Sequence, residues 1–153
     1  RQVSSAASDV YKRQKLLSDE KVLKIFHFGR FDIAALLKTF GILTSPVYCT
    51  KIASKLVRTY TDRHGLKNLL QELLGIDISK QQQSSDWGAV TLTDAQLEYA
   101  ASDVLYLHSL KDELDLRLLR EGRMDLAKSS FDFLPTRARL DLIGWPETDI
   151  FAH

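Results

Sequence analysis

KIFHFGRFD, the stretch Lys24–Asp32, decides the fold of this chain. Its first residues close the apolar run Val22–Phe26, which has the length and the β-branched and aromatic residues of a buried strand. Gly29 follows, and the apolar residues beyond it recur at the spacing of a helix over Arg30–Phe40: Ile33, Leu36, Leu37 and Phe40. A strand that leads directly into a helix predicts a crossover connection to a second, parallel strand.

Downstream segments complete an α/β pattern. A short strand is predicted at Pro46–Thr50, with the proline at its first position, where a missing donor is tolerated. Apolar periodicity and capping signals predict further helical segments: Lys51–Tyr60, Leu66–Leu74, Thr93–Arg120 and patches within Arg123–Ile143. Lys80–Gly88 is polar and irregular, which predicts a loop. Two strands are few for a sheet that buries both faces, so we expect that further strands belong upstream.

Composition limits the class of protein. The chain has 153 residues, a one-domain length, and its 44% hydrophobic and 27% charged residues exclude a disordered chain. The net charge of +1 means that any nucleic-acid binding must come from a local patch. Cys49 is the only cysteine, which excludes an internal disulfide and a cysteine-rich zinc site and favours a reducing, cytoplasmic location. No apolar run is long enough to span a bilayer, so no membrane partner is expected.

Three side chains on two segments could carry chemistry. Asp32 enters the first turn of a helix six residues beyond Phe26, and sites in open α/β sheets gather at the carboxyl ends of strands. Tyr99 and Asp103, within LEYAASD, are spaced i and i+4 on one side of a helix. The alternatives are a first-turn carboxylate favoured by the helix dipole and an ordinary surface helix.

In order and spacing, five segments from Leu16 to Leu114 resemble the ribonuclease D branch of the 3'-5' exonucleases, the tyrosine subtype of the DEDD superfamily. These segments are the strand with HFGRFD, VYCTKIASKLV, HGLKNLLQELLGIDISK, a polar loop ending at Asp86–Trp87, and LTDAQLEYAASDVLYL. Each segment is weak evidence by itself, but five in the right order form a consistent pattern.

The resemblance implies a ribonuclease H-like fold and metal-dependent removal of 3'-terminal nucleotides, from single-stranded RNA rather than DNA. Asp32 and Asp103 match the metal-site aspartates of the family, and Tyr99 matches the tyrosine that orients the attacking water. Mg²⁺ or Mn²⁺ needs oxygen ligands, and two such ions about 4 Å apart can stabilise both the attacking and the leaving oxygen.

The chain departs from the family at the first acidic motif, an Asp-x-Glu on an earlier strand. The nearby pair Asp19–Glu20 is adjacent rather than i, i+2, and we interpret it as solvated turn charge. We therefore expect residues 15–122 to be a partial exonuclease domain that lacks N-terminal strands and is inactive by itself. A helical extension is expected over residues 123–153, and residues 1–14, which lack apolar periodicity, are interpreted as a non-native linker.

Basic and aromatic residues provide candidate substrate contacts. Cationic side chains near a predicted helix start and before the polar loop can hold phosphates: Arg58, Arg63, His64, Lys67 and Lys80. His27 and Phe28 could border or stack on a terminal nucleotide. The alternatives are ordinary solvated surface for the cations and a satisfied strand-end histidine for His27.

Three functions stay open at this point. The first is a 3'-5' exonuclease that acts on RNA. The second is a non-catalytic exonuclease-like module that binds nucleic acid or a protein, and the third is an unrelated α/β interaction domain. An Asp-x-Glu on an upstream strand would favour the first function over the second. The sequence gives no indication of the oligomeric state.

Overall fold

The computed structural model describes residues 11, 12, 14–78 and 94–153, without the side chains of residues 94–105. The described residues belong to two compact units. The first unit combines the chain up to Cys49 with Asp125–His153, and the second is Thr50–Met124. The polar loop predicted at Lys80–Gly88 and most of the predicted linker lie outside the described residues. The domain borders predicted from sequence therefore stay predictions.

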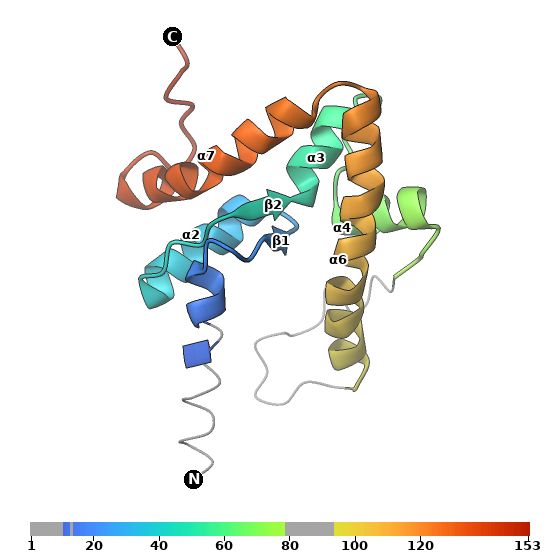
Figure 1. Ribbon diagram of the computed structural model, residues 1–153, viewed down its shortest axis with the longest axis horizontal. Helices are drawn as coiled ribbons and strands as arrows, with labels where there is room; N and C mark the ends of the chain where they lie inside the picture. Colours follow the sequence, from blue (N-terminus) through green and yellow to red (C-terminus); the bar gives the residue numbers. More distant parts are fainter. Residues whose placement is uncertain (1–10, 13, 79–93) are drawn as a thin grey trace. The chain divides into compact units, whose positions relative to one another are not determined.

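Two short parallel strands and the helix between them form the centre of the first unit (Figure 1). β1 (Lys24–Phe26) pairs with β2 (Val47–Cys49), with the first residues of the two strands opposite each other. α2 (Gly29–Phe40) connects the strands and packs against both. The predicted crossover is confirmed, although each strand is two residues shorter than predicted. Val22 instead closes a turn, with its N–H donating to the carbonyl of Asp19, and Thr50 begins the next helix.

The junction between β1 and α2 is only two residues long. Phe28 takes a left-handed conformation, with φ 64° and ψ 52°, which is uncommon for a bulky residue. Gly29 packs beside both strands: an added Cβ would lie in ordinary van der Waals contact, 3.4 Å from the Cβ of Phe26 and 3.7 Å from that of Cys49. The Gly29 N–H donates to the Cys49 Sγ at 3.4 Å. This tight turn fixes where α2 starts.

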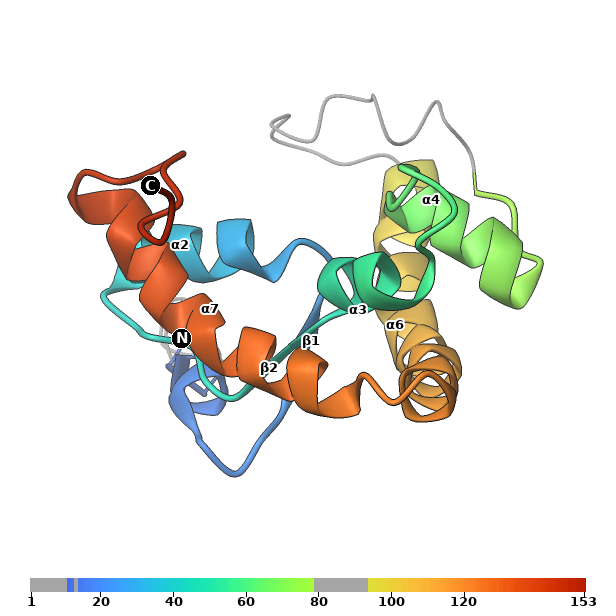
Figure 2. The same ribbon diagram turned by 90° about the horizontal axis from the view of Figure 1, so that it is seen from above.

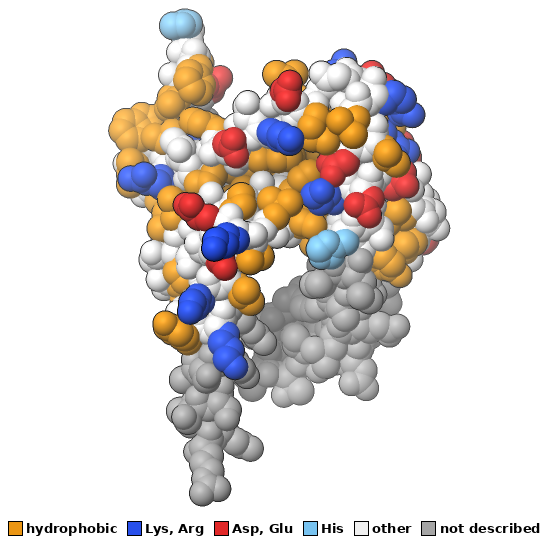
Figure 3. Space-filling view, in the orientation of Figure 1, with side chains coloured by type: hydrophobic (Ala, Val, Ile, Leu, Met, Phe, Trp, Pro, Cys, Tyr) orange, Lys and Arg blue, Asp and Glu red, His pale blue; other side chains and the backbone are white. Residues whose placement is uncertain are grey.

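α7 (Met124–Ile143) contacts β2 and crosses it when seen from above (Figure 2). The ring centroids of Tyr48 and Phe131 are 4.6 Å apart. Sequence reasoning expected only helical patches here, but the helix continues through the buried Pro135. Burial of Pro135 within the first unit offsets the loss of the backbone hydrogen bond that proline cannot donate. Hydrophobic side chains also gather at the surface over the end of α7 (Figure 3), where the exposed residues include Leu142, Ile143, Trp145, Ile150 and Phe151.

The second unit is helical among its described residues. Its elements are α3 (Thr50–Val57), α4 (Leu66–Leu69), the π-helical turn η1 (Leu70–Leu74) and α6 (Asp94–Arg120). α6 packs against α3 and η1. The side chains that fill this core are fully buried: Leu69, Leu70, Leu110, Leu114 and Leu118. The predicted leucine face is therefore core, and Gly75 ends η1 with φ 67°, as a glycine stop requires.

Arg58 is the polar centre of this unit. Its side chain is only 4% exposed, and its Nε donates to Glu72 Oε2 at 2.5 Å. Its Nη1 donates to Ser54 Oγ at 3.0 Å and to the carbonyl of Arg63 at 2.6 Å. A buried guanidinium is tolerated only when its donors are satisfied in this way. Within the described part of the chain, no helix is both long enough and apolar enough to cross a membrane.

Replacing Arg58 should destabilise the protein strongly. Arg58→Met removes the donors to Glu72, to Ser54 Oγ and to the carbonyl of Arg63, and we expect the free energy of unfolding to fall by about 2–4 kcal/mol. Urea denaturation followed by circular dichroism measures this change. Arg120→Met is the matched control, because its side chain is 71% exposed at the end of α6. Equal stability of the two variants would show that the Arg58 network contributes nothing.

Candidate functional site

Asp32 is the described carboxylate whose environment is most unusual. It lies in the first turn of α2, just beyond the β1 junction, and is half-buried. Burial raises the pKa of its carboxyl from 3.8 to about 6. No cationic side chain among the described residues contributes to this pKa, so nothing there offsets the burial of its charge. A half-buried carboxylate of this kind fits a divalent cation, which prefers oxygen ligands.

Tyr99 and Asp103 lie on the backbone of α6, which confirms that they are spaced i and i+4 along one helix. Their side chains lie outside the described part of the structure. Asp32 belongs to the first unit and the pair to the second. The meeting of these three residues at one site therefore stays a prediction. Among the described side chains, no group of three or more His, Cys, Asp or Glu could hold a metal ion.

The aromatic candidates lie at the β1–α2 junction. His27 is half-buried, and Phe28 is 44% exposed. The ring of Phe28 stacks on that of Phe31, with centroids 6.1 Å apart and an interplanar angle of 9°. Phe31 is 64% exposed, and sequence reasoning did not select it. The left-handed backbone at Phe28 and the two exposed rings lie close to Asp32 in the sequence. Strained backbone of this kind is common at functional sites.

The basic candidates divide into a structural group and a surface group. Arg58, grouped with the phosphate-binding candidates from sequence, is buried in the network of the second unit. His64 joins that network, because its Nδ1 lies 2.8 Å from Ser54 Oγ. Burial and the neighbouring Arg58 lower the pKa of His64. Arg63 is exposed and Lys67 half-buried, while Lys80 lies outside the described residues.

Sequence reasoning missed an ion cluster in the first unit. Arg30 donates to both carboxylate oxygens of Asp141, each at 2.6 Å. Arg137 Nε lies 3.3 Å from Asp141 Oδ1, which makes an ion pair, but its N–H does not form a hydrogen bond. The i, i+4 spacing of Arg137 and Asp141 was a visible signal for a helix pair. Nothing in the sequence pointed to Arg30, which lies 111 residues away from Asp141.

Residues 2–119 match the 3'-5' exonuclease domain family. The chain therefore belongs to the 3'-5' exonuclease family, and the third candidate function, an unrelated α/β domain, is wrong. Among curated relatives, ribonuclease D of Gluconacetobacter diazotrophicus is 39% identical over 135 residues, which are 87% of this chain and 33% of that protein. The chain thus spans about a third of the length of this relative.

Solved structures give the same family. Brucella melitensis NrnC with bound Mg²⁺ has 63% sequence identity and a TM-score of 0.85, over 91% of this chain and 67% of that chain. Escherichia coli RNase D, an exoribonuclease involved in structured RNA processing, has 28% identity and a TM-score of 0.73, over 82% and 33% of the two chains. These similarities confirm the predicted ribonuclease H-like exonuclease fold and the ribonuclease D resemblance.

The raised pKa of Asp32 gives a pH-dependent stability. A carboxyl with a pKa of about 6 when folded and 3.8 otherwise holds its proton more tightly in the folded state. Its contribution to stability is therefore full below about pH 4 and is lost as the pH rises through 6. Asp32→Asn should remove this loss of stability. Between pH 4 and 8, the free energy of unfolding of the variant should therefore rise by about 1–3 kcal/mol relative to the parent, where the lower value allows for solvent screening.

Urea denaturation in buffers that contain a chelator measures this difference. Asp132→Asn, at an exposed position of α7, is the matched control for the removal of one carboxylate. A constant difference for Asp32→Asn across the same range would contradict the unusual environment assigned to Asp32.

Proposed function

We propose that the protein containing this chain is a metal-dependent 3'-5' exoribonuclease that removes nucleotides from the 3' end of single-stranded RNA. The observation that carries the proposal is Asp32, a half-buried carboxylate without an offsetting cation among the described residues, placed just beyond a parallel strand. Membership of the 3'-5' exonuclease family supports the reaction class. The location proposed from the single cysteine is the cytoplasm.

Asp32 and Asp103 would hold Mg²⁺ or Mn²⁺. When bound, such ions polarise the phosphodiester and stabilise the charge that develops on the attacking and leaving oxygens. The Mg²⁺ bound to the similar NrnC supports this cofactor class. Two carboxylates are too few to hold two ions well, so we propose that the two-metal site needs carboxylates beyond those identified in this sequence and that these residues alone are inactive.

Tyr99 would orient the attacking water, since a phenol one helical turn from Asp103 can hydrogen-bond a nucleophile near the scissile phosphate. Phe28 would stack on a terminal base, with His27 at its edge. Arg63, His64, Lys67 and Lys80 would hold backbone phosphates. Of these, His64 combines half-burial with a lowered pKa, which favours its neutral form at neutral pH.

The proposed substrate is RNA rather than DNA. The curated relatives include ribonuclease D, and a structure of Brucella melitensis NrnC bound to pGG has 65% identity to this chain. We propose that very short RNAs are among the substrates. The alternative is a non-catalytic module that binds nucleic acid or a protein.

Loss of a metal-site carboxylate should abolish trimming. With the whole protein, a 5'-labelled single-stranded RNA and Mn²⁺, we expect stepwise shortening from the 3' end. Asp103→Asn or Asp32→Asn should lower the rate by about 10²–10³-fold, because the charge on the reacting phosphate loses its stabilisation. Asp112→Asn, at an exposed position of the same helix as Asp103, should keep the parent rate. Undiminished trimming by Asp103→Asn, or trimming in a chelator, would overturn the proposal.

The role of Tyr99 can be separated from binding. Tyr99→Phe removes the phenolic hydroxyl and should lower kcat by about 10²-fold while KM for RNA changes little. Tyr106→Phe, seven residues later on α6, is the control and should leave kcat unchanged. Steady-state kinetics on one oligoribonucleotide measures both constants. A rise in KM alone would assign Tyr99 to substrate binding instead.

A further inference from the structure

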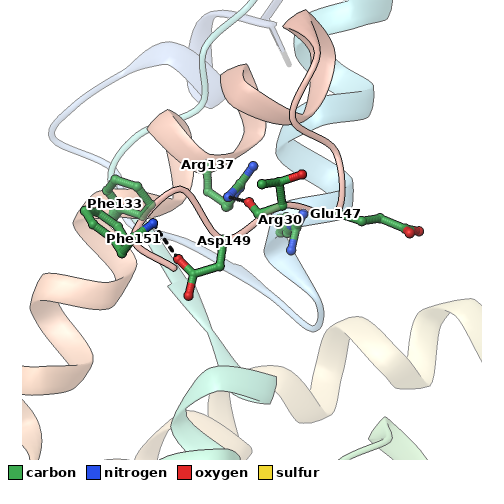
Figure 4. Close-up of a pocket in the computed structure, with 7 residues that line it drawn as sticks. Arg30, Phe133, Arg137, Glu147, Asp149 and Phe151 are labelled. Atoms are coloured by element: carbon green, nitrogen blue, oxygen red, sulfur yellow. Dashed lines mark hydrogen bonds between the residues drawn. The ribbon is translucent and has the colours of Figure 1, made fainter. Parts of the chain in front are cut away.

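The C-terminal segment of the first unit is held by an ion cluster, which we call the Asp141 clamp. It consists of Arg30, Arg137 and Asp141 together with three carbonyl groups of the tail. Arg30 donates to both oxygens of Asp141 and to the carbonyl of Pro146. Arg137 donates to the carbonyls of Trp145 and of Thr148, the latter at 2.7 Å. Figure 4 shows Arg30 from α2 and Arg137 from α7 side by side beneath the tail.

The clamp is a partly buried and geometrically specific interaction. The side chain of Asp141 is 13% exposed and that of Arg30 is 36% exposed. A two-pronged guanidinium–carboxylate pair fixes orientation as well as distance, which a lysine in place of arginine cannot do. The clamp therefore restrains the direction of the α2 start relative to α7, within one unit of the structure.

The start of α2 has no side-chain cap, and among its backbone hydrogen bonds is one from the Phe31 N–H to the Phe28 carbonyl at 3.1 Å. Phe28, at the N-cap position, makes no side-chain capping hydrogen bond and has a left-handed backbone. Helix starts without a capping side chain are weakened by their unsatisfied N–H groups. The Gly29 N–H finds a weak acceptor in the Cys49 sulfur. Arg30 is the next residue of this first turn, so the clamp is a restraint on the turn that also carries Asp32.

We propose that the Asp141 clamp is a positioning device for Asp32, holding the first turn of α2 so that the Asp32 carboxylate is presented in one place for a divalent cation. This inference rests on the proposed function, because it takes Asp32 as a metal ligand. Arg30, Arg137 and Asp141 are positioning residues, and they act through the backbone of α2 and not on the metal or the substrate. Groups that hydrogen-bond a metal ligand directly set metal affinity by about 10–100-fold, and we expect the clamp, which acts through the backbone, to reach only the lower end of that range.

The test measures metal binding directly, with the whole protein and Mn²⁺ alone. The electron paramagnetic resonance signal of free Mn²⁺ gives the dissociation constant without any turnover. Asp141→Asn should raise that constant about tenfold while circular dichroism shows the parent helix content. Asp132→Asn, an exposed aspartate on the same helix, removes the same charge without touching the clamp and should bind as the parent does.

Two further variants separate positioning from general stability. Arg30→Lys keeps the charge but loses the two-pronged geometry, and should raise the dissociation constant by up to about tenfold. Asp141→Glu keeps the carboxylate, so its dissociation constant for Mn²⁺ should stay near the parent value. If Asp141→Asn does not fold, the Arg30→Lys and Asp141→Glu pair decides the matter. Parent-like Mn²⁺ binding by Arg30→Lys and by any folded Asp141→Asn would overturn the inference.

The two proposals fail in different ways. If Asp32→Asn binds Mn²⁺ as tightly as the parent, Asp32 is not a metal ligand and the proposed function fails along with the clamp. If Asp32→Asn loses binding but Asp141→Asn behaves like Asp132→Asn, only the clamp fails. Supporting the inference requires that Asp32→Asn and Asp141→Asn both weaken binding while Asp132→Asn does not.

Discussion

The constraint on which the first unit depends is the two-residue junction between β1 and α2. Parallel strands need a crossover, and here the helix starts almost at once, so the chain must reverse sharply. The left-handed Phe28 makes the reversal, and the Gly29 N–H then donates to the sulfur of Cys49 at the end of β2. Because Asp32 lies one turn further, the same reversal sets a carboxylate beyond the end of the sheet, which is where open α/β folds place their sites.

Much of the secondary structure could be predicted because it depends on local patterns. The apolar stripe from Ile33 to Phe40 and the stop at Gly41 define α2, and the leucines before Gly75 define a buried helical face. The prediction was less complete where packing overrides local preference. Pro135 should interrupt a helix by its own chemistry, but it is buried in the middle of α7, where the surrounding unit supports the backbone.

The candidate site was predictable in part for the same reason. Asp32 was selected by its position after a strand, which is a local signal. Arg58 illustrates the limit of prediction from sequence. An arginine near Arg63 and Lys67 gives the same sequence pattern whether its side chain binds a phosphate or is buried in a hydrogen-bond network. Only the structure distinguishes these cases, with Arg58 satisfied by Ser54, Glu72 and the carbonyl of Arg63. Contacts between distant segments, such as Arg30 with Asp141, leave no pattern in a single sequence.

Two aspartates of the first unit show opposite electrostatic arrangements. Asp141 lies between the guanidinium groups of Arg30 and Arg137, whereas Asp32, two residues from Arg30 in the sequence, has no cation that offsets its burial among the described residues. Arg30, in the first turn of α2, therefore pairs with Asp141 and the C-terminal tail and not with Asp32. A cation beside the half-buried Asp32 would favour its charged form and lower its pKa. Leaving that carboxylate at a raised pKa is the arrangement expected where a group must bind or react, which is why we propose Asp32, and not the Asp141 clamp, as the functional residue of this unit.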